Sequence, residues 1–460
     1  MKKKYNFLAN LFMYLTIIVF SIISVIFLIT SNAFLFLIAF LILVWISIKN
    51  NIKHFPILLF VLCFLIRIIA ILFLNFPQVS DFKILLDASI NFSHGDYSFQ
   101  KISYFATWGY QTGFVVYQGL ILKLFSNPII LKILNGIYSS VLCVLIYIFS
   151  KKISSEKSAR LSSLLYMIFP YQIYMNSVMA NHHIATFLTY IGILFLLKKE
   201  AKIKDYIIAA ILISFGNIMR PEGIIVICSL ILFELFKLKK ETIKDVLKKL
   251  LIFLTIYLLI GSLSSFIIKK TNINKTGLSN NDPLWKFVLG FNHEKCGYYD
   301  DNDVYLLQNK EEELKVIKER LLVNPVKMAK LMSCKTTNFW LQSDLKAKNE
   351  MYMNKKINIM NQKINFTDIE NIILKFNEYL YIITFLMCII GVIFNRKKVI
   401  ESEAVFFVIL MIVTFFVYLL IEIQPRYAYF IHVSIFVLST YGYDYMLNLI
   451  DKKLKKRRIN

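Results

Sequence analysis

Residues 237–268 read KLKKETIKDVLKKLLIFLTIYLLIGSLSSFII. The first part of this stretch is rich in lysine, and the part from residue 249 onward is almost wholly apolar. A helix that crosses a bilayer needs about 20 apolar residues, and a basic segment before it is typical of its cytoplasmic end. The stretch therefore predicts a membrane-spanning helix with a known direction, and the same pattern recurs along the chain.

The composition agrees with a membrane protein. The chain has 460 residues, of which 57% are hydrophobic and 18% are charged, whereas soluble domains have about 45–50% and about 25%. Such a composition excludes a disordered chain and a small disulfide-rich domain. The net charge of +24 is compatible with nucleic acid binding, so the positions of the positive charges decide what this charge means.

Length and flanking charge predict about twelve transmembrane helices in an all-α polytopic protein. The predicted spans are residues 7–30, 33–48, 56–74, 130–149, 160–178, 184–198, 206–220, 222–237, 249–268, 376–394, 404–421 and 428–448. The first is too long for a cleaved signal peptide and is expected to remain as an anchor.

Basic residues alternate along this set of spans. With the N-terminus in the cytoplasm, every second connection is rich in lysine or arginine, and together these connections hold more than half of the 53 such residues. The positive-inside rule then places both termini in the cytoplasm. The charge excess is a topology signal with some attraction for anionic lipid, and no nucleic acid partner is expected.

Two segments outside the membrane are long enough to hold chemistry, and they set the domain organisation. An N-terminal transmembrane module, residues 1–268, includes the first outer loop at 75–128. Residues 112–126 in that loop are too short to span and are expected to form a helix in the outer interface. Residues 269–375 form a large outer loop, with an amphipathic helix near Glu311–Leu322. The C-terminal spans and the basic tail, 376–460, complete the chain.

Two of the six cysteines, Cys296 and Cys334, lie in the large outer loop. An extracytoplasmic compartment permits a disulfide. The spacing alone does not require one, so both states stay open and two free thiols are favoured. No CxxC, HExxH, Walker or GxGxxG pattern is present. The sequence thus predicts no cofactor and no dedicated metal site, although a divalent metal stays open.

Several polar residues fall at the outer membrane edge or within a span. Asp81 follows the third span closely and is a candidate general base, and Asp87 is the second candidate. Arg67 lies inside a span, where an arginine is costly and usually paired or functional. For each carboxylate the alternative is a helix cap or a solvated loop residue.

Three short outer turns add further candidates. Asn181-His182-His183 joins two spans, and neighbouring histidines diverge on a helix, so we expect them to contact substrate or cap the turn rather than share one metal. Arg220-Pro221-Glu222 and Gln424-Pro425-Arg426-Tyr427 each place an arginine at the outer membrane edge. These arginines are candidate phosphate ligands, with an internal salt bridge or snorkelling as the alternative.

In these places the chain resembles the GT-C superfamily of polytopic glycosyltransferases, in particular bacterial relatives of the dolichyl-phosphate-mannose protein mannosyltransferases. The resemblance rests on Arg67, Ser80-Asp81-Phe82, the helix from Gly109 to Phe125, Asn181-His182-His183, Arg220-Pro221, Pro425-Arg426-Tyr427, and residues 285–297, WKFVLGFNHEKCG. The chain has Phe82 and a histidine where many relatives have acidic residues. Both departures argue against metal dependence.

The resemblance implies an inverting sugar transfer from a polyprenyl-phosphate donor to an acceptor hydroxyl, at the outer face of a bacterial plasma membrane. For this reaction Asp81, the acidic residue nearest to the outer end of a span, is the expected catalytic base. The residues expected to contact substrate are Arg67, Asp87, Asn181, His182, His183, Arg220, Arg426 and Tyr427. The acceptor stays open among a glycan, a teichoic acid and a protein.

Two other functions fit the same location. A flippase or transporter for lipid-linked oligosaccharide is expected to show inverted repeats and helices broken by glycine or proline, and neither is evident here. A polysaccharide polymerase or ligase shares the large outer loop. A lipid-linked donor needs no cytosolic nucleotide site, and the absence of such a motif agrees with the use of such a donor.

Overall fold

The computed structural model describes residues 34–49, 52–73, 77–237, 242–341, 356–359 and 362–459. This part of the chain is almost wholly helical, as predicted. The expected anchor at 7–30 lies outside it. Its strands are one antiparallel pair, β1 (Lys356–Ile359) and β2 (Gln362–Asn365).

Ten of the predicted spans coincide with single helices in these ranges. They are α2 (Phe34–Ile48), α3 (Phe55–Phe73), α7 (Ile129–Ile153), α10 (His182–Leu196), α11 (Ile203–Met219), α12 (Gly223–Lys237), α13 (Ile243–Lys270), α18 (Phe366–Phe394), α20 (Ala404–Leu420) and α21 (Tyr429–Ile459). Four described segments are long and apolar enough to cross a membrane, namely Phe55–Phe73, Ile129–Ile153, Ile243–Lys270 and Asn371–Phe394. The number twelve therefore stays a prediction.

The predicted span at 160–178 is wrong as a single helix. The chain forms α8 (Glu156–Met167) and a short α9 (Pro170–Met175) instead. Phe169 between them is extended, with φ −66° and ψ 111°. Proline disfavours the helical conformation in the residue before it, and its ring clashes with the preceding turn. Pro170 thus ends the first helix and starts the second.

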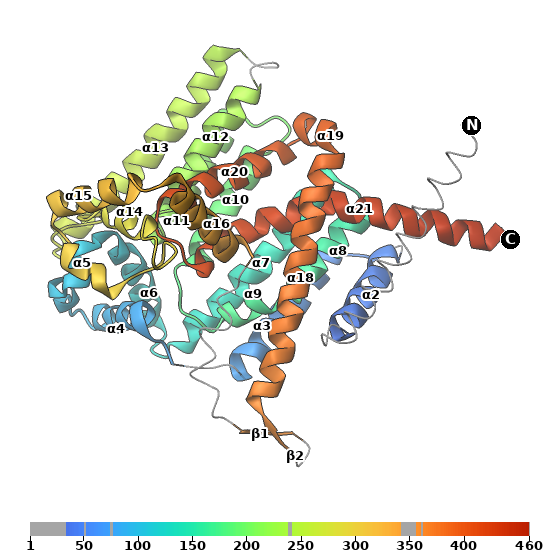
Figure 1. Ribbon diagram of the computed structural model, residues 1–460, viewed down its shortest axis with the longest axis horizontal. Coiled ribbons are helices and arrows are strands. Elements are labelled where there is room, and N and C mark those ends of the chain that lie inside the picture. Colours follow the sequence, from blue (N-terminus) through green and yellow to red (C-terminus); the bar gives the residue numbers. More distant parts are fainter. Residues whose placement is uncertain are drawn as a thin grey trace.

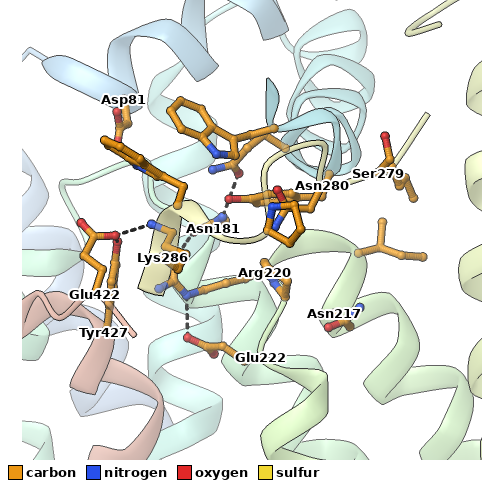
Figure 2. Close-up of a pocket in the computed structure, with 18 of the residues that line it drawn as sticks. Asp81, Asn181, Asn217, Arg220, Glu222, Ser279, Asn280, Lys286, Glu422 and Tyr427 are labelled. Carbon is orange, nitrogen blue, oxygen red and sulfur yellow. Dashed lines mark hydrogen bonds and ion pairs between the residues drawn. The ribbon is translucent and has the colours of Figure 1, made fainter. Parts of the chain in front are cut away.

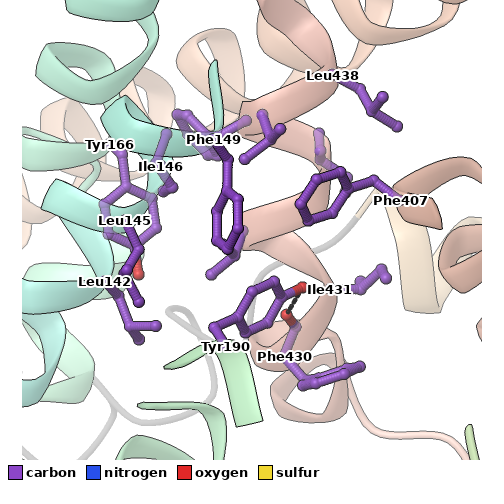
Figure 3. Close-up of a cluster of buried hydrophobic side chains, with 14 of the residues drawn as sticks. Leu142, Leu145, Ile146, Phe149, Tyr166, Tyr190, Phe407, Phe430, Ile431 and Leu438 are labelled. Atoms are coloured by element: carbon purple, nitrogen blue, oxygen red, sulfur yellow. Dashed lines mark hydrogen bonds between the residues drawn. The ribbon is translucent and has the colours of Figure 1, made fainter. Parts of the chain in front are cut away.

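The buried centre of the bundle lies around α21. Side chains of α7, α8, α10 and α20 pack against Phe430, Ile431 and Leu438 of this helix (Figure 3). The Tyr190 hydroxyl donates to the Phe430 carbonyl at 3.0 Å. Close packing and internal hydrogen bonds stabilise helix association where lipid offers no hydrophobic driving force. The turn that directly precedes α21, Pro425–Ala428, is therefore attached to a closely packed helix.

The two segments predicted to lie outside the membrane, called the outer segments below, gather at one end of the molecule (Figure 1). The first contains α4 (Ser80–Ser93), α5 (Ser103–Thr107), the turn η2 (Gly109–Gln111) and α6 (Thr112–Leu124). The second contains α14 (Trp285–Gly290), the turn η3 (Asp301–Leu306), α15 (Lys310–Leu321) and α16 (Pro325–Trp340). The helices expected at 112–126 and 311–322 are therefore present as α6 and α15.

Backbone contacts join the two outer segments. The Tyr110 N–H donates to the Ser279 carbonyl at 3.0 Å, and the Asn281 N–H donates to the Thr107 carbonyl at 2.9 Å. Gly109 lies between them, and a Cβ there would come within 2.5 Å of the Thr276 hydroxyl. Since only glycine allows this approach, the two segments form one continuous wall.

Cys296 and Cys334 form a disulfide, so the preference for free thiols is wrong. Their Cα atoms lie 5.9 Å apart, a separation that the bond allows. α16 brings Cys334 beside the loop that follows α14, which the spacing in the sequence does not reveal. Next to it, the Lys335 ammonium donates to the carbonyls of Gly290, Leu419 and Ile421 at 2.8–2.9 Å. The disulfide thus joins α16 to the loop after α14, and Lys335 binds the end of α20.

We expect reduction of this disulfide to destabilise the outer segment. A native disulfide contributes about 2–4 kcal/mol to the free energy of unfolding. Cys334→Ser should therefore make residues 269–341 sensitive to limited proteolysis, and reductant should do the same to the wild type. Cys228→Ser, which changes a free cysteine, is the matched control. Equal proteolysis of Cys334→Ser and wild type would contradict the expectation.

Candidate functional site

A cavity of about 1450 Å³ lies between the two outer segments and the ends of the helices. Six predicted site residues line it: Asp81, Asn181, His182, Arg220, Arg426 and Tyr427. They come from α4, α10, the turn between α11 and α12, and the turn η4 (Pro425–Ala428) before α21. Parts of the chain that are far apart in sequence thus meet at one polar site.

Asp81 and Arg426 form the first of three ion pairs. An Oδ of Asp81 lies 3.2 Å from a terminal nitrogen of Arg426. Asp81 occupies the first turn of α4, where the helix dipole favours a negative charge. The Arg426 guanidinium lies 4.9 Å from the centre of the Phe82 ring, and this contact holds it beside the carboxylate.

Arg220 and Glu222 form the second pair, with 2.5 Å between Nε and Oε1. Arg220 ends α11 in an extended conformation, because Pro221 follows it. Its guanidinium also donates to the Asn181 side-chain oxygen at 3.4 Å. The Asn181 side-chain nitrogen donates to the Met219 carbonyl at 3.1 Å, so the start of α10 and the end of α11 are joined at the arginine.

Lys286 and Glu422 form the third pair, and neither was among the residues predicted from sequence. Glu422 also accepts from Gln424 at 2.8 Å and from the Tyr427 hydroxyl at 3.2 Å. Burial alone would raise the pKa of Glu422, but the charge of Lys286 and the hydrogen bonds from Lys286 and Gln424 hold this pKa below its usual value. The same pairing outweighs burial and raises the pKa of Lys286, so both groups are charged near neutral pH.

The ring of Tyr427 lies at the centre of these pairs. The charged groups of Arg220, Lys286 and Arg426 lie 4.7, 5.8 and 5.8 Å from its centre. The ring of His182 stacks at 6.5 Å. An aromatic face attracts cations within about 6 Å. Tyr427 therefore gathers three positive groups around one point of the cavity.

Several neutral polar groups lie across the cavity from the carboxylates of Asp81 and Glu422 (Figure 2). Figure 2 shows Asp81, Glu422 and Tyr427 on one side and Asn217, Ser279 and Asn280 on the other, with Lys286 and Arg220 between them. The aromatic residues Tyr104, Trp108, Tyr110 and Trp285 also line it. Amides, hydroxyls and aromatic faces are the groups that bind neutral hydroxyl-rich molecules by hydrogen bonds and stacking.

Three predicted site residues do not line the cavity. Arg67 is buried and donates to Ser139 at 3.3 Å and to the carbonyls of Met167 and Tyr166. His183 contacts the Tyr429 hydroxyl and the Met175 carbonyl, each at 2.9 Å. Asp87 pairs with Lys83 one turn earlier in α4, where both side chains are exposed. The structure thus gives Arg67 and His183 packing contacts and Asp87 a surface ion pair.

The sequence contains only a weak indication of the Lys286–Glu422 pair, which was not predicted. Glu422 is two residues before Gln424-Pro425, and Lys286 follows Trp285 in the stretch already singled out. Nothing in the order of residues shows that these positions, 136 residues apart, meet. Within the described ranges, no group of three or more His, Cys, Asp or Glu residues is placed to hold a metal ion. The expectation of no dedicated metal site, with a divalent metal left open, stays a prediction.

Apolar helices around a cavity of paired charges define the chain as a helical membrane protein with a polar site. The family model described as dolichyl-phosphate-mannose-protein mannosyltransferase matches residues 115–264, which include Asn181, His182 and Arg220. This match confirms the resemblance seen in the sequence. The match covers 150 of the 460 residues, so it shows similarity to this glycosyltransferase family over that part of the chain.

Among solved structures, the chain is similar to the archaeal oligosaccharyltransferase AglB from Archaeoglobus fulgidus, in complex with an inhibitory peptide and a dolichol-phosphate. The sequences are 12% identical and the TM-score is 0.46, over 89% of this chain and 52% of that chain. The chain therefore spans about half the length of AglB. No curated protein sequence matches it.

Proposed function

We propose that the protein transfers a sugar from a polyprenyl-phosphate donor to an acceptor hydroxyl, with inversion at the anomeric carbon, at the outer face of a bacterial plasma membrane. The observation that carries the proposal is the cavity, which combines a carboxylate open to it with cations gathered around Tyr427. Sugar transfer from a phosphate ester needs a base for the acceptor and positive charge for the leaving phosphate.

Asp81 is the proposed base. Its side chain is 42% exposed, whereas that of its partner Arg426 is 14% exposed, so the carboxylate faces the cavity. The acceptor oxygen attacks the anomeric carbon and gives its proton to Asp81, while the bond from that carbon to the phosphate oxygen breaks. Since one carboxylate serves as the base and the phosphate leaves with its electron pair, the paired carboxylates of hydrolases are not needed.

Arg220 and Arg426 are the proposed ligands of the donor phosphate. A guanidinium has five N–H donors in a plane, so each arginine is able to hold its carboxylate and still bind phosphate oxygens with another edge. Arg426 in this arrangement links the phosphate to the base, 3.2 Å away. Asn181 and His182 then contact the bound substrate from α10.

The proposed outer location is supported by the disulfide and by the positions of the basic connections. Structural disulfides are typical of extracytoplasmic compartments, and Cys296–Cys334 lies in the same segment as Lys286. α21 begins next to the cavity and ends at the opposite end of the molecule (Figure 1). With the cavity outside, this helix carries the C-terminus to the cytoplasm.

We expect an impermeant maleimide to label Asn302→Cys in intact cells and to spare Lys152→Cys. Both positions are exposed in the structure, so a difference in labelling reports the side of the membrane. The background should lack Cys63, Cys143, Cys228 and Cys388 but keep the disulfide. Permeabilised cells, in which both positions react, are the control. Labelling of Lys152→Cys from outside would reverse the proposed topology.

A transfer assay tests the function itself. The purified protein in vesicles is mixed with a radiolabelled polyprenyl-phosphate sugar and with a glycan, teichoic acid or peptide acceptor. Transfer of label to an acceptor supports the proposal. Movement of the labelled lipid between leaflets without transfer indicates a flippase. Transfer only from an oligosaccharide on a polyprenyl diphosphate indicates a polymerase or ligase.

A further inference from the structure

The ion pairs of the cavity differ in which partner faces the open space. In the Lys286–Glu422 pair, the lysine side chain is 33% exposed and the glutamate side chain is 2% exposed. In the Arg426–Asp81 pair the order is reversed, and the carboxylate is the exposed partner. One pair therefore presents an acid to the cavity, and the other presents an ammonium group with its carboxylate behind it.

The position of Lys286 is fixed from several sides. Trp285 beside it is buried, and the Glu422 N–H donates to the Lys286 carbonyl at 2.8 Å. At the end of α14, a Cβ on Gly290 would come within 2.3 Å of the Leu420 carbonyl oxygen, so the helix lies directly against the end of α20. Groups held on rigid elements in this way do not reorganise when charge develops nearby.

We propose that Lys286 is a catalytic residue that binds the leaving phosphate, and that Glu422 is its positioning residue. This inference rests on the proposed function. It follows from the ammonium that opens to the cavity beside Tyr427, 5.8 Å from the ring centre. Glu422 binds both Lys286 and the Tyr427 hydroxyl. It therefore holds the ammonium group of Lys286 next to the ring of Tyr427.

The charge balance of the reaction gives Lys286 a specific role. The donor is a phosphodiester with one negative charge. When the bond from the anomeric carbon breaks, its electron pair stays on the phosphate oxygen, and the product is a monoester with about −1.5 to −2 charges near pH 7. The acceptor proton is on Asp81. A cation next to that oxygen stabilises the transition state and the product more than it stabilises the bound donor. Its removal should therefore lower kcat more than it weakens donor binding.

The test compares Lys286→Gln, Lys286→Arg and Glu422→Gln with the wild type. The double variant Lys286→Gln/Glu422→Gln replaces the ion pair by two amides and avoids a lone buried charge, which by itself destabilises a protein. Lys315→Gln, an exposed lysine of α15, is the matched control. The measurements are kcat and KM for the donor, and the Kd for polyprenyl phosphate in vesicles of neutral lipid.

The expected result is a fall in kcat of about 10²-fold in Lys286→Gln and in the double variant, with a donor KM within a few-fold of wild type. The Kd for polyprenyl phosphate should rise about 10-fold or more. Lys286→Arg should recover part of the product binding, since it keeps the charge. Glu422→Gln should lower kcat less than Lys286→Gln, because the ammonium remains but is less well held.

Two results would overturn the proposal. One is wild-type kcat and product binding in a folded Lys286→Gln or double variant. The other is an equal loss of donor and product affinity with kcat unchanged, which indicates uniform binding rather than stabilisation of the leaving group. Both require a wild type that transfers sugar. A wild type that binds polyprenyl phosphate through Lys286 without any sugar transfer would reject the proposed function instead.

Discussion

Asp81→Asn is expected to lower kcat by about 10²–10⁴-fold, the usual effect of removing a general base. Asparagine has nearly the same shape and still accepts a hydrogen bond from Arg426, 3.2 Å away in the wild type. An exposed ion pair contributes at most about 1 kcal/mol, and Asp81 is nearly half-exposed, so the variant should fold. The rate of sugar transfer at saturating donor, together with donor binding, measures the effect.

Asp87→Asn is the matched control for this substitution, because it makes the same change two turns further along α4. Asp87 pairs with Lys83 on an exposed face and does not line the cavity. The control should therefore transfer sugar at nearly the wild-type rate. A full loss of turnover in Asp87→Asn, with Asp81→Asn active, would show that the base has been assigned to the wrong carboxylate.

Arg220→Lys is expected to weaken donor binding by about 10–100-fold, since a hydrogen bond to a charged group is worth about 1.5–3 kcal/mol. Lysine keeps the positive charge but cannot bind Glu222, Asn181 and a phosphate through one planar group. The wild-type guanidinium contacts both side chains and lies 4.7 Å from the centre of the Tyr427 ring. Equilibrium binding of the donor to protein in vesicles measures the loss.

Arg396→Lys provides the control, because Arg396 is exposed in a connection predicted to be cytoplasmic. It should bind the donor as the wild type does. If Arg220→Lys also keeps wild-type affinity, Arg220 serves only the internal ion pair with Glu222. The phosphate would then have to be bound by Arg426 and Lys286.

The helical elements were largely predictable from the sequence. Apolar runs such as 249–268 and the lysines before them are local features of the sequence. A helix that spans a bilayer is a continuous apolar segment, and its orientation depends on the charges of the residues that flank it. Arg220, Arg426 and Tyr427, which line the cavity, were chosen as candidates for a similar reason. Each lies in a proline turn next to an apolar run, where a polar residue needs an explanation.

Features that depend on packing between distant segments did not follow from the sequence. Arg67 was a candidate because an arginine in a span is costly, and the structure shows that Ser139 and two backbone carbonyls accept its hydrogen bonds. The pairing of Cys296 with Cys334 required α16 to lie beside the loop after α14. Local pattern carries no information on such contacts.

What the sequence by itself determined is the class of the protein, a helical membrane protein with polar turns next to its apolar helices. Only the tertiary structure decided that these turns enclose one cavity, that Asp81 is the more exposed partner of its ion pair with Arg426, and that Lys286 of the outer segment belongs to the cavity. The physical reason is the range of the interactions. Helix formation and membrane insertion depend on neighbouring residues, whereas an ion pair such as Lys286–Glu422 forms only after the outer segment folds onto the end of α20.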